Sequence, residues 1–172
     1  MHLTPLKPSI ITILCHDSEA LLRVSPMEDR FANDLVELLN NDTKLIESLD
    51  SKKKSLTREE FISHNEIWGK KNHAKIHAIL LNDKAIGMIS LSHIKTADKS
   101  AKIGYWIASE QWGKGYATEA FRQMLEIAKE NHIKSVSGTI PNGNKASKAI
   151  WQKFGAKFKT KDDTSIPKIT IQ

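Results

Sequence analysis

Apolar residues in the first part of the chain recur at a helical period. They predict a helix over residues 25–40, with a buried stripe made of Met27, Phe31, Leu35, Leu38 and Leu39. Ser25 and Glu28 have the spacing of a capping box, with Pro26 at the first helical position. The polar stretch over residues 41–56 then interrupts the pattern, and we expect it to be a mobile loop.

A second capping box predicts a second helix, over residues 57–68. Thr57 would cap this helix, and the side chain of Glu60 would bond back to the Thr57 backbone. Phe61 and Trp68 are the apolar residues that we expect to face a core.

From residue 76 onward the apolar runs become short and are bounded by turns, which is typical of strands. Three such runs cover residues 76–81, 85–91 and 101–108. A tight turn at 82–84 and a longer turn at 95–100 join them, so we expect three antiparallel strands.

The rest of the chain alternates helices and strands. We expect a first strand at 19–24, a helix at 117–131, a strand at 133–140, a helix at 144–154 ended by Gly155, and closing strands at 156–160 and 168–172. This order implies one mixed sheet with helices on both faces. We expect a single domain over residues 19–172, preceded by an irregular leader over residues 1–18.

Composition narrows the class of protein. The 172 residues are 40% apolar and 27% charged, and no apolar run is long enough to span a membrane, so we expect a cytoplasmic protein. Cys15 is the only cysteine, which excludes an intrachain disulfide. The formal net charge of +6 suits a polyanionic partner, either nucleic acid or a phosphate-bearing cofactor. No zinc-finger spacing or interleaved aromatic residues indicate a nucleic-acid module.

A glycine-rich turn stands directly before the helix at 117–131, in the sequence "QWGKGYATEA". The first backbone amides of a helix have no partner within it, and its dipole makes that end positive, so such a turn is either an anion site or a plain tight turn. A P-loop would need Gly at Ala108 and Ser or Thr at Gly115, and a dinucleotide fingerprint would need Gly or Ala at Thr118. Neither pattern is present.

Two segments together resemble a known family. "IGYWIASEQWGKGYATEA" and "NGNKASKAIWQKFGAKF" are similar to motifs of the GNAT superfamily of acetyl-CoA-dependent N-acetyltransferases, in particular its RimJ/RimL-type branch. The match is strong over residues 85–158 and weaker back to residue 21. The resemblance implies an α/β (α+β) GNAT fold, with a mixed, mostly antiparallel sheet of six to seven strands and helices on both faces.

The resemblance also implies how acetyl-CoA, as cosubstrate, would be bound. The pyrophosphate loop maps onto Trp112, Gly113, Lys114, Gly115, Tyr116 and Ala117. The family has Gln or Arg at the first of these positions, where this chain has Trp112. The strand ending at Ile107 would separate from the next strand and expose backbone groups to the pantetheine arm, which Asn144 would also contact.

The reaction that the resemblance implies is direct attack by a primary amine in a ternary complex, without an acyl-enzyme. Many relatives carry a tyrosine seven residues after the asparagine as the acid for the leaving thiolate, but this chain has Trp151 there. Ser147 stands where the RimL-type branch has a serine, and we expect it to bond to or protonate the departing sulfur. The alternative is that Ser147 is an ordinary polar residue near a helix start.

The general base is harder to place. Relatives often have Glu just before the "IGYW" segment, where this chain has Lys102, which is protonated at neutral pH. His93 is the best substitute, acting through water, because an unperturbed histidine titrates near neutral pH. Glu66 is a weaker candidate, and an ordinary surface or core histidine is the alternative for His93.

Partners follow from these assignments. The expected acceptor is a protein N-terminal amine or a small amine; a homodimer is left open, because relatives usually carry more chain after the last helix to complete a hairpin beside the acceptor. Two other readings stay open: an acyl-CoA-binding sensor without catalysis, and a basic protein associated with RNA or the ribosome. We expect no membrane or direct nucleic-acid partner, and no metal, since His73 and His77 have no obvious third ligand.

Overall fold

The computed structural model describes residues 9–11, 20–52 and 55–172. Within them the elements are β1 (Ser9–Ile11), β2 (Ala20–Pro26), α1 (Ala32–Asn41), α2 (Thr43–Ser48), α3 (Arg58–Lys71), β3 (Lys75–Leu81), β4 (Lys84–Lys95), β5 (Ser100–Ile107), α4 (Tyr116–Glu130), β6 (Ser135–Ser137), β7 (Ile140–Pro141), α5 (Lys145–Lys153), β8 (Lys157–Lys161) and β9 (Thr164–Thr170). Two short 3-10 turns, η1 (Asp29–Phe31) and η2 (Ser109–Gln111), precede α1 and the glycine turn.

One sheet runs through the described part of the chain, in the order β1-β2-β3-β4-β5-β6-β9-β7, with β8 paired to β9. Only the β5–β6 pair among these ladders is parallel. The mixed, mostly antiparallel sheet is therefore confirmed. It has nine strands in the described residues rather than six or seven.

Two differences account for the larger number of strands. Ser9–Ile11, within the expected leader, forms β1 against β2, while residues 1–8 and 12–19 lie outside the described residues. The strand expected at 133–140 is two short strands, β6 and β7, interrupted at Gly138. A Cβ on Gly138 would lie 2.6 Å from Cζ2 of Trp151, so the backbone passes directly against that indole.

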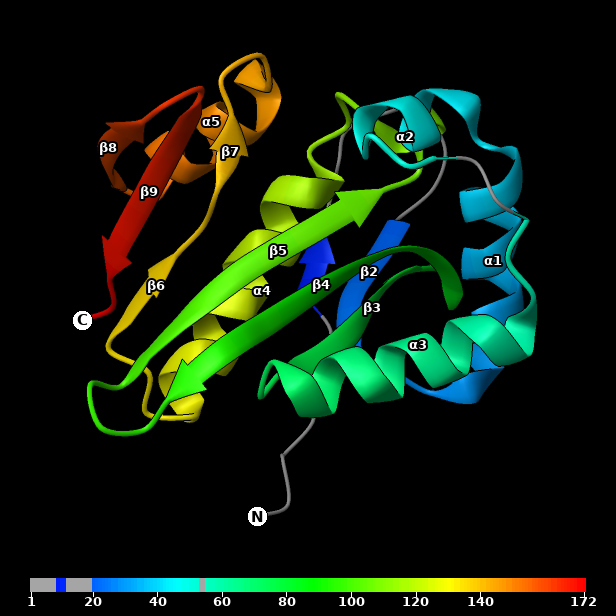
Figure 1. Ribbon diagram of the computed structural model, residues 1–172, viewed down its shortest axis with the longest axis horizontal. Helices are drawn as coiled ribbons and strands as arrows, with labels where there is room; N and C mark the ends of the chain where they lie inside the picture. The colour runs from blue at the N-terminus through cyan, green and yellow to red at the C-terminus, as the bar shows by residue number, and fades with distance from the viewer. Residues whose placement is uncertain (1–8, 12–19, 53–54) are drawn as a thin grey trace.

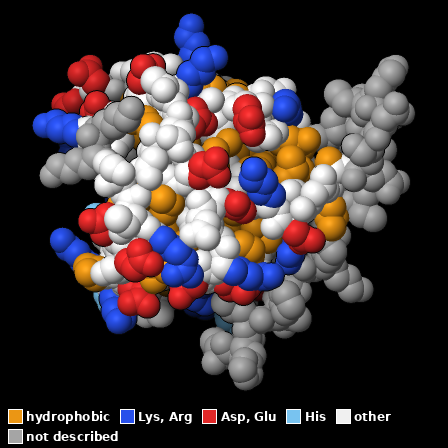
Figure 2. All heavy atoms as spheres, turned by 90° about the vertical axis from the view of Figure 1, so that its right-hand side faces the viewer, with side chains coloured by type: hydrophobic (Ala, Val, Ile, Leu, Met, Phe, Trp, Pro, Cys, Tyr) orange, Lys and Arg blue, Asp and Glu red, His pale blue; other side chains and the backbone are white. Residues whose placement is uncertain are grey.

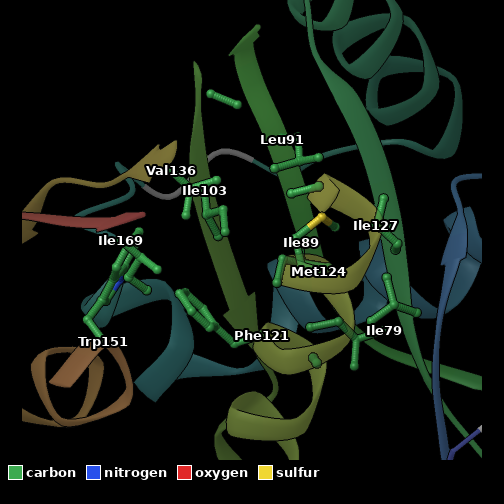
Figure 3. Close-up of a cluster of buried hydrophobic side chains, with 14 of the residues drawn as sticks. Ile79, Ile89, Leu91, Ile103, Phe121, Met124, Ile127, Val136, Trp151 and Ile169 are labelled. Carbon is green, nitrogen blue, oxygen red and sulfur yellow. The ribbon is translucent and has the colours of Figure 1, made fainter. Parts of the chain in front are cut away.

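Helices cover the two faces of the sheet unequally (Figure 1). On one face, α1 packs on β4 and α3 on β3; on the other, α4 packs on β2 and β4 and α5 on β9. The larger buried cluster lies between the sheet and the α4–α5 layer, and Figure 3 shows Ile89 and Ile103 from the strands meeting Phe121 and Met124 of α4. This core fixes α4, and therefore its N-terminus, against the sheet.

The start of the first helix is not where the capping pattern predicts it. Ser25 and Pro26 are the last residues of β2 and pair with Ala78 and His77 of β3. α1 begins only at Ala32, and no capping box forms. Pairing with a neighbouring strand therefore outweighs the local capping pattern.

The segment expected as a mobile loop contains a helix. α2 buries Leu45 and Ile46, and the side chain of Asp42 caps it by accepting a hydrogen bond from the Leu45 amide at 3.1 Å. Two adjacent apolar residues in a polar stretch show no helical period, so the pattern alone could not reveal this helix.

The second predicted helix is confirmed as α3, with the Thr57–Glu60 capping box in place. Phe61 is buried as expected. Trp68 is not, because it lies near the C-terminal end of α3, which points away from α1, and its side chain stays 40% exposed (Figure 1).

The β3–β4 and β8–β9 strand pairs are hairpins that bear on the sequence predictions. The tight turn between β3 and β4 is confirmed, and both Asn82 and Asp83 have positive φ, as a two-residue turn of this kind requires. The final hairpin that we expected to need further chain is also present: β8 and β9 pair from Lys157–Lys168 to Lys161–Thr164.

Candidate functional site

The glycine turn leads directly into α4. Gly113 and Gly115 have φ of 74° and 82°, and Gly115 is the N-cap of the helix. A Cβ at either glycine would meet nothing within 4 Å, so the positive φ, not crowding, favours glycine here. The same observation shows that the space beside this backbone is open.

The N-terminus of α4 has no side-chain cap from its N-cap residue, because glycine has none to offer. The first helical hydrogen bond of this turn runs from the Glu119 amide to the Gly115 carbonyl at 3.1 Å. Tyr116, Ala117 and Thr118 precede that bond, so their amides point out of the helix end. Lys114, which is exposed, adds a positive charge there. The arrangement suits an anion.

β5 and β6 separate beside this helix end. Their parallel pairing ends at Lys102 and Ser137, whereas β5 continues to Ile107 and pairs there only with Gly87 of β4. Within the described residues, no strand pairs with the β6-facing edge of β5 beyond Lys102. Figure 1 shows the two strands diverging as a V beyond this pair, and we call this divergence of their backbones the V-shaped opening. An open strand edge offers backbone donors and acceptors to a ligand.

Trp112 ties the glycine turn to this edge. Its indole Nε1 donates to the Ile107 carbonyl at 3.0 Å, while the ring stays 45% exposed. One of the backbone groups that the resemblance assigns to the pantetheine arm is therefore already bonded by the loop itself. The carbonyl retains a second lone pair for a ligand.

Ser147 lies in the first turn of α5 and contacts Tyr105 of β5. The two hydroxyl oxygens are 2.7 Å apart. Burial raises the pKa of Tyr105, although its hydrogen bond with Ser147 acts in the opposite direction. Tyr105 therefore keeps its proton at neutral pH, and the sequence interpretation did not include it among the candidate site residues. Its only sequence signal was its place in "IGYW", two residues before Ile107.

Two other predicted residues have structural roles. Asn144 caps α5 by accepting from the Ser147 amide at 3.0 Å, and so positions the serine. Trp151 is 1% exposed and packs edge-to-face on Phe121, with ring centroids 4.8 Å apart. Trp151 thus fills the core at the base of the opening.

His93 lies apart from the Tyr105–Ser147 pair. It sits in the irregular end of β4, beyond the Ser92–Lys102 pair, with φ of 50° and an exposed side chain. Its Nδ1 lies 3.1 Å from Oγ of Ser92. Three residues of strand, about 10 Å, separate Lys102 from Tyr105, so the register does not bring His93 to Ser147. Glu66 is exposed on α3 and lines a separate cavity of about 700 Å³ beside α3 and β3.

Asp42 is far from the glycine turn in sequence, but it bonds to Ser109 in the segment that leads into that turn. Besides capping α2, its carboxylate accepts from the Ser109 amide at 2.7 Å and from the Ser109 hydroxyl at 2.6 Å. Partial burial alone would raise the pKa of Asp42, but these hydrogen bonds, with that from Leu45, hold it below its ordinary value. No local pattern could have indicated a contact between residues so far apart.

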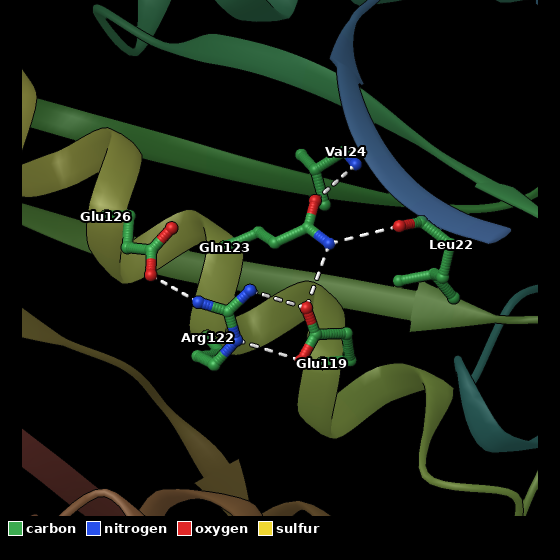
Figure 4. Close-up of polar contacts among 6 residues, drawn as sticks. All are labelled: Leu22, Val24, Glu119, Arg122, Gln123 and Glu126. Carbon is green, nitrogen blue, oxygen red and sulfur yellow. Dashed lines mark hydrogen bonds and ion pairs between the residues drawn. The ribbon is translucent and has the colours of Figure 1, made fainter. Parts of the chain in front are cut away.

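A buried glutamine anchors α4 to the sheet (Figure 4). Gln123 accepts from the Val24 amide at 2.8 Å and donates to the Leu22 carbonyl at 3.2 Å and to Glu119 at 3.0 Å. Glu119 in turn bonds Arg122. These bonds set the position of the helix whose N-terminus faces the opening.

The described residues hold neither a candidate metal site nor a candidate membrane span. They contain no group of three or more His, Cys, Asp or Glu that could hold a metal ion. None of their helices is both long and apolar enough to cross a membrane.

The fold and site define a class of protein. The family model of the acetyltransferase (GNAT) domain matches residues 22–157, so the chain belongs to the GNAT acetyltransferase family. The predicted family resemblance is confirmed.

Particular relatives refine this assignment. Over 82 residues, the chain is 39% identical to the putative ribosomal N-acetyltransferase YdaF of Bacillus subtilis, covering 46% of this chain and 45% of YdaF. The chain therefore spans about half the length of that curated relative.

Solved structures show the same fold. RimL, a ribosomal L7/L12 alpha-N-protein acetyltransferase in complex with coenzyme A, has a TM-score of 0.74 at 22% identity, covering 87% of this chain and 94% of RimL. The spermidine N-acetyltransferase of Vibrio cholerae, in complex with CoA and spermine, has a TM-score of 0.75 at 15% identity, covering 87% and 95%.

Proposed function

We propose that this protein transfers an acetyl group from acetyl-CoA to a primary amine by direct attack in a ternary complex. The observation that carries the proposal is the juxtaposition of two open backbone features: the uncapped N-terminus of α4 and the unpaired edge of β5. The first suits a diphosphate and the second suits an amide-bearing arm.

The glycine turn would hold the diphosphate. The amides from Gly113 to Ala117 are placed to donate to it, and Lys114 adds charge, while Trp112 holds the turn against Ile107. The open space beside both glycines fits close approach of a phosphate group. We expect the pantetheine arm to extend between Ile107, at the end of β5, and Asn144, at the start of α5.

Bound acetyl-CoA supplies an activated thioester, and the protein's part is to place it and to supply a proton. Tyr105 and Ser147 lie on opposite sides of the opening and share a hydrogen bond. We assign Ser147, with Tyr105 behind it, as the donor of the proton that the leaving sulfur requires. Because burial raises the pKa of Tyr105, the pair keeps that proton throughout the neutral range.

The acceptor we favour is a protein N-terminal amine. The names of YdaF and RimL, which are a putative ribosomal N-acetyltransferase and an alpha-N-protein acetyltransferase, support this choice. An α-amine has a pKa near 8, so it needs less help in losing its proton than a lysine side chain does. His93, the residue that the sequence suggested for accepting that proton, lies beyond the Ser92–Lys102 pair, about 10 Å or more along the sheet from Tyr105, so one water cannot link it to this site.

A thiol-release assay tests the proposal. Acetyl-CoA would be mixed with the protein and a panel of peptide N-termini and small amines, with CoA binding measured in parallel by calorimetry. We expect CoA to bind and at least one peptide to be acetylated at its α-amine. CoA binding without turnover across the panel would instead favour the sensor reading, and salt-sensitive nucleic-acid binding that ignores CoA would favour an RNA-associated protein.

A further inference from the structure

Five lysines lie on one face of the strands around the V-shaped opening. They are Lys102 on β5, Lys157, Lys159 and Lys161 on β8, and Lys168 on β9. We call this surface the lysine face. The strands that carry these lysines are β5, β8 and β9. Neither they nor β6, which lies between β5 and β9, contain Asp or Glu.

The strand register places the lysines on the same side of the sheet. Lys102 pairs with Ser137, Ser137 with Lys168, and Lys168 with Lys157. Directly opposed residues project to the same face, and so do alternate residues along one strand. Lys159 and Lys161 therefore join the row that starts at Lys102.

The opposite side of these strands is the core, so the lysines cannot turn inward. Ile103, Val136 and Ile169, which alternate with them, are buried against the α4–α5 layer. The lysine side chains are exposed, and Figure 1 shows no helix in front of β6, β8 and β9.

The acidic residues Asp162 and Asp163 lie in the β8–β9 turn, next to Lys161 and at the end of the lysine face far from Lys102. Among the described residues, none of the five lysines forms an ion pair. By contrast, the side of the molecule shown in Figure 2 carries acidic and basic side chains interspersed. A surface of one sign attracts a ligand of the other sign.

The lysine face begins at the base of the opening. Lys102 and Ser137 form the last β5–β6 pair before the strands separate. Lys168 lies two strands from Lys102, about 10 Å away, and Lys157 about 14 Å away. An acceptor peptide whose amine reaches the opening and whose chain then extends toward β6, β9 and β8 would place its following residues over these charges.

We infer that the lysine face binds an acidic segment that follows the acceptor amine, so that the acceptor is a polypeptide with Asp or Glu soon after its N-terminus. This inference rests on the proposed acetyl transfer to an α-amine. Alternate side chains of an extended peptide are spaced about 6.6 Å apart, which is the spacing of Lys157, Lys159 and Lys161 along β8.

The charges also select among acceptors. A polycationic acceptor such as a polyamine is repelled. Single-stranded RNA is less suited than an acidic peptide, because β6, β8 and β9 present no aromatic side chain on this face for base stacking.

The test uses three peptides that differ only at positions two to six: acidic, neutral and lysine-rich. We expect kcat/KM from thiol release to fall roughly tenfold from the acidic to the neutral peptide and further to the lysine-rich peptide, and the preference to shrink as salt is added. Lys168→Glu should remove or invert the preference, with Lys168→Gln intermediate. Lys153→Glu, on the exposed side of α5, is the matched control and should leave the preference unchanged.

Other outcomes distinguish failure of the proposed acetyl transfer from failure of the proposed binding of an acidic segment. Equal kcat/KM for acidic and neutral peptides would overturn the inference and leave acetyl transfer intact. If no amine is acetylated, acetyl transfer fails, and anisotropy with a labelled acidic peptide still decides the inference: binding that is unchanged in folded Lys168→Glu overturns it. Tighter binding of a twelve-nucleotide oligouridine than of the acidic peptide at equal salt would also overturn it.

Discussion

The two arms of the sheet on either side of the V-shaped opening are built differently. In the first arm, β3 is buried on both faces between α1 and α3 on one side and α4 on the other, and its residues from Ala78 to Leu81 are continuously apolar. In the second arm, β9 and β8 meet a helix on one face only. On β8, lysines alternate with Phe158 and Thr160, and on β9 the exposed Lys168 stands between the buried Pro167 and Ile169. The first arm is thus covered by helices on both faces, and the second leaves one face exposed.

The comparison assigns different tasks to the two arms. The glycine turn, Trp112 and the open β5 edge all belong to the first arm, whereas the free lysine face lies mostly on the second. Ser147 from the second arm meets Tyr105 from the first. The proposed proton donor thus depends on both arms being held together.

The largest expected effect comes from removing the buried indole of Trp151, which packs in the core where the two arms meet. Trp151→Ala should lower the free energy of unfolding by about 3–5 kcal/mol, because it empties a fully buried indole site. Denaturant unfolding measures this. Trp68→Ala, at a 40% exposed position, is the control and should cost less than about 1 kcal/mol. Similar costs for the two variants would show that the arms are not joined by this core.

The next effect concerns the attachment of α4 to the first arm. Gln123→Leu should destabilise the protein by about 2–3 kcal/mol, since it leaves the Val24 amide and the Leu22 carbonyl buried without partners. Denaturant unfolding again gives the value, with Gln152→Leu on the exposed side of α5 as the control. A cost below that of the control would contradict the role given to Gln123.

A substitution in the glycine turn should change CoA binding more than it changes the stability of the protein. Gly115→Val should weaken CoA binding roughly tenfold, because a β-branched residue is strained at a φ of 82° and would crowd the amides. Calorimetry with CoA measures the change, and Gly143→Val, at a glycine without positive φ, is the control. Unchanged affinity in Gly115→Val would place the diphosphate elsewhere.

Loss of the Tyr105–Ser147 hydrogen bond, which joins the two arms, should lower turnover. Ser147→Ala and Tyr105→Phe should each lower kcat by about tenfold, with little change in KM for acetyl-CoA, because only the proton donor is lost. Steady-state thiol release gives both constants. The double variant should be no slower than the slower single variant if the hydroxyls act as one unit, and additive losses would argue against a shared role.

The smallest expected effect is on the pH dependence of stability, through Asp42 in the first arm. The pKa of Asp42 is lowered in the folded protein, so its ionised form contributes stability above the ordinary value of 3.8 and loses that contribution as pH falls through the folded pKa. Asp42→Asn should therefore be less stable than the wild type at pH 7, with a gap that narrows below pH 3.8. Thermal midpoints across pH would show this, and a gap independent of pH would contradict it.

Sequence patterns predicted the elements whose signals are local. The Thr57–Glu60 box, the Asn82–Asp83 turn and the glycine turn before α4 each depend on residues within a few positions of one another. The family motifs could be read for the same reason. The failures came where distant segments compete with local signals, as at Ser25 and Pro26, which pair with β3 instead of starting a helix.

The amino-acid sequence by itself determined the family and the position of the expected diphosphate loop, because both depend on contiguous residues with fixed backbone requirements. Tertiary structure decided which distant residues meet: Ser147 with Tyr105 across the opening, Asp42 with Ser109 before the glycine turn, and Gln123 with β2. It also gathered lysines from three strands onto one face. The physical reason is that strand register and helix packing join residues that are far apart in sequence, and no local pattern encodes such pairings.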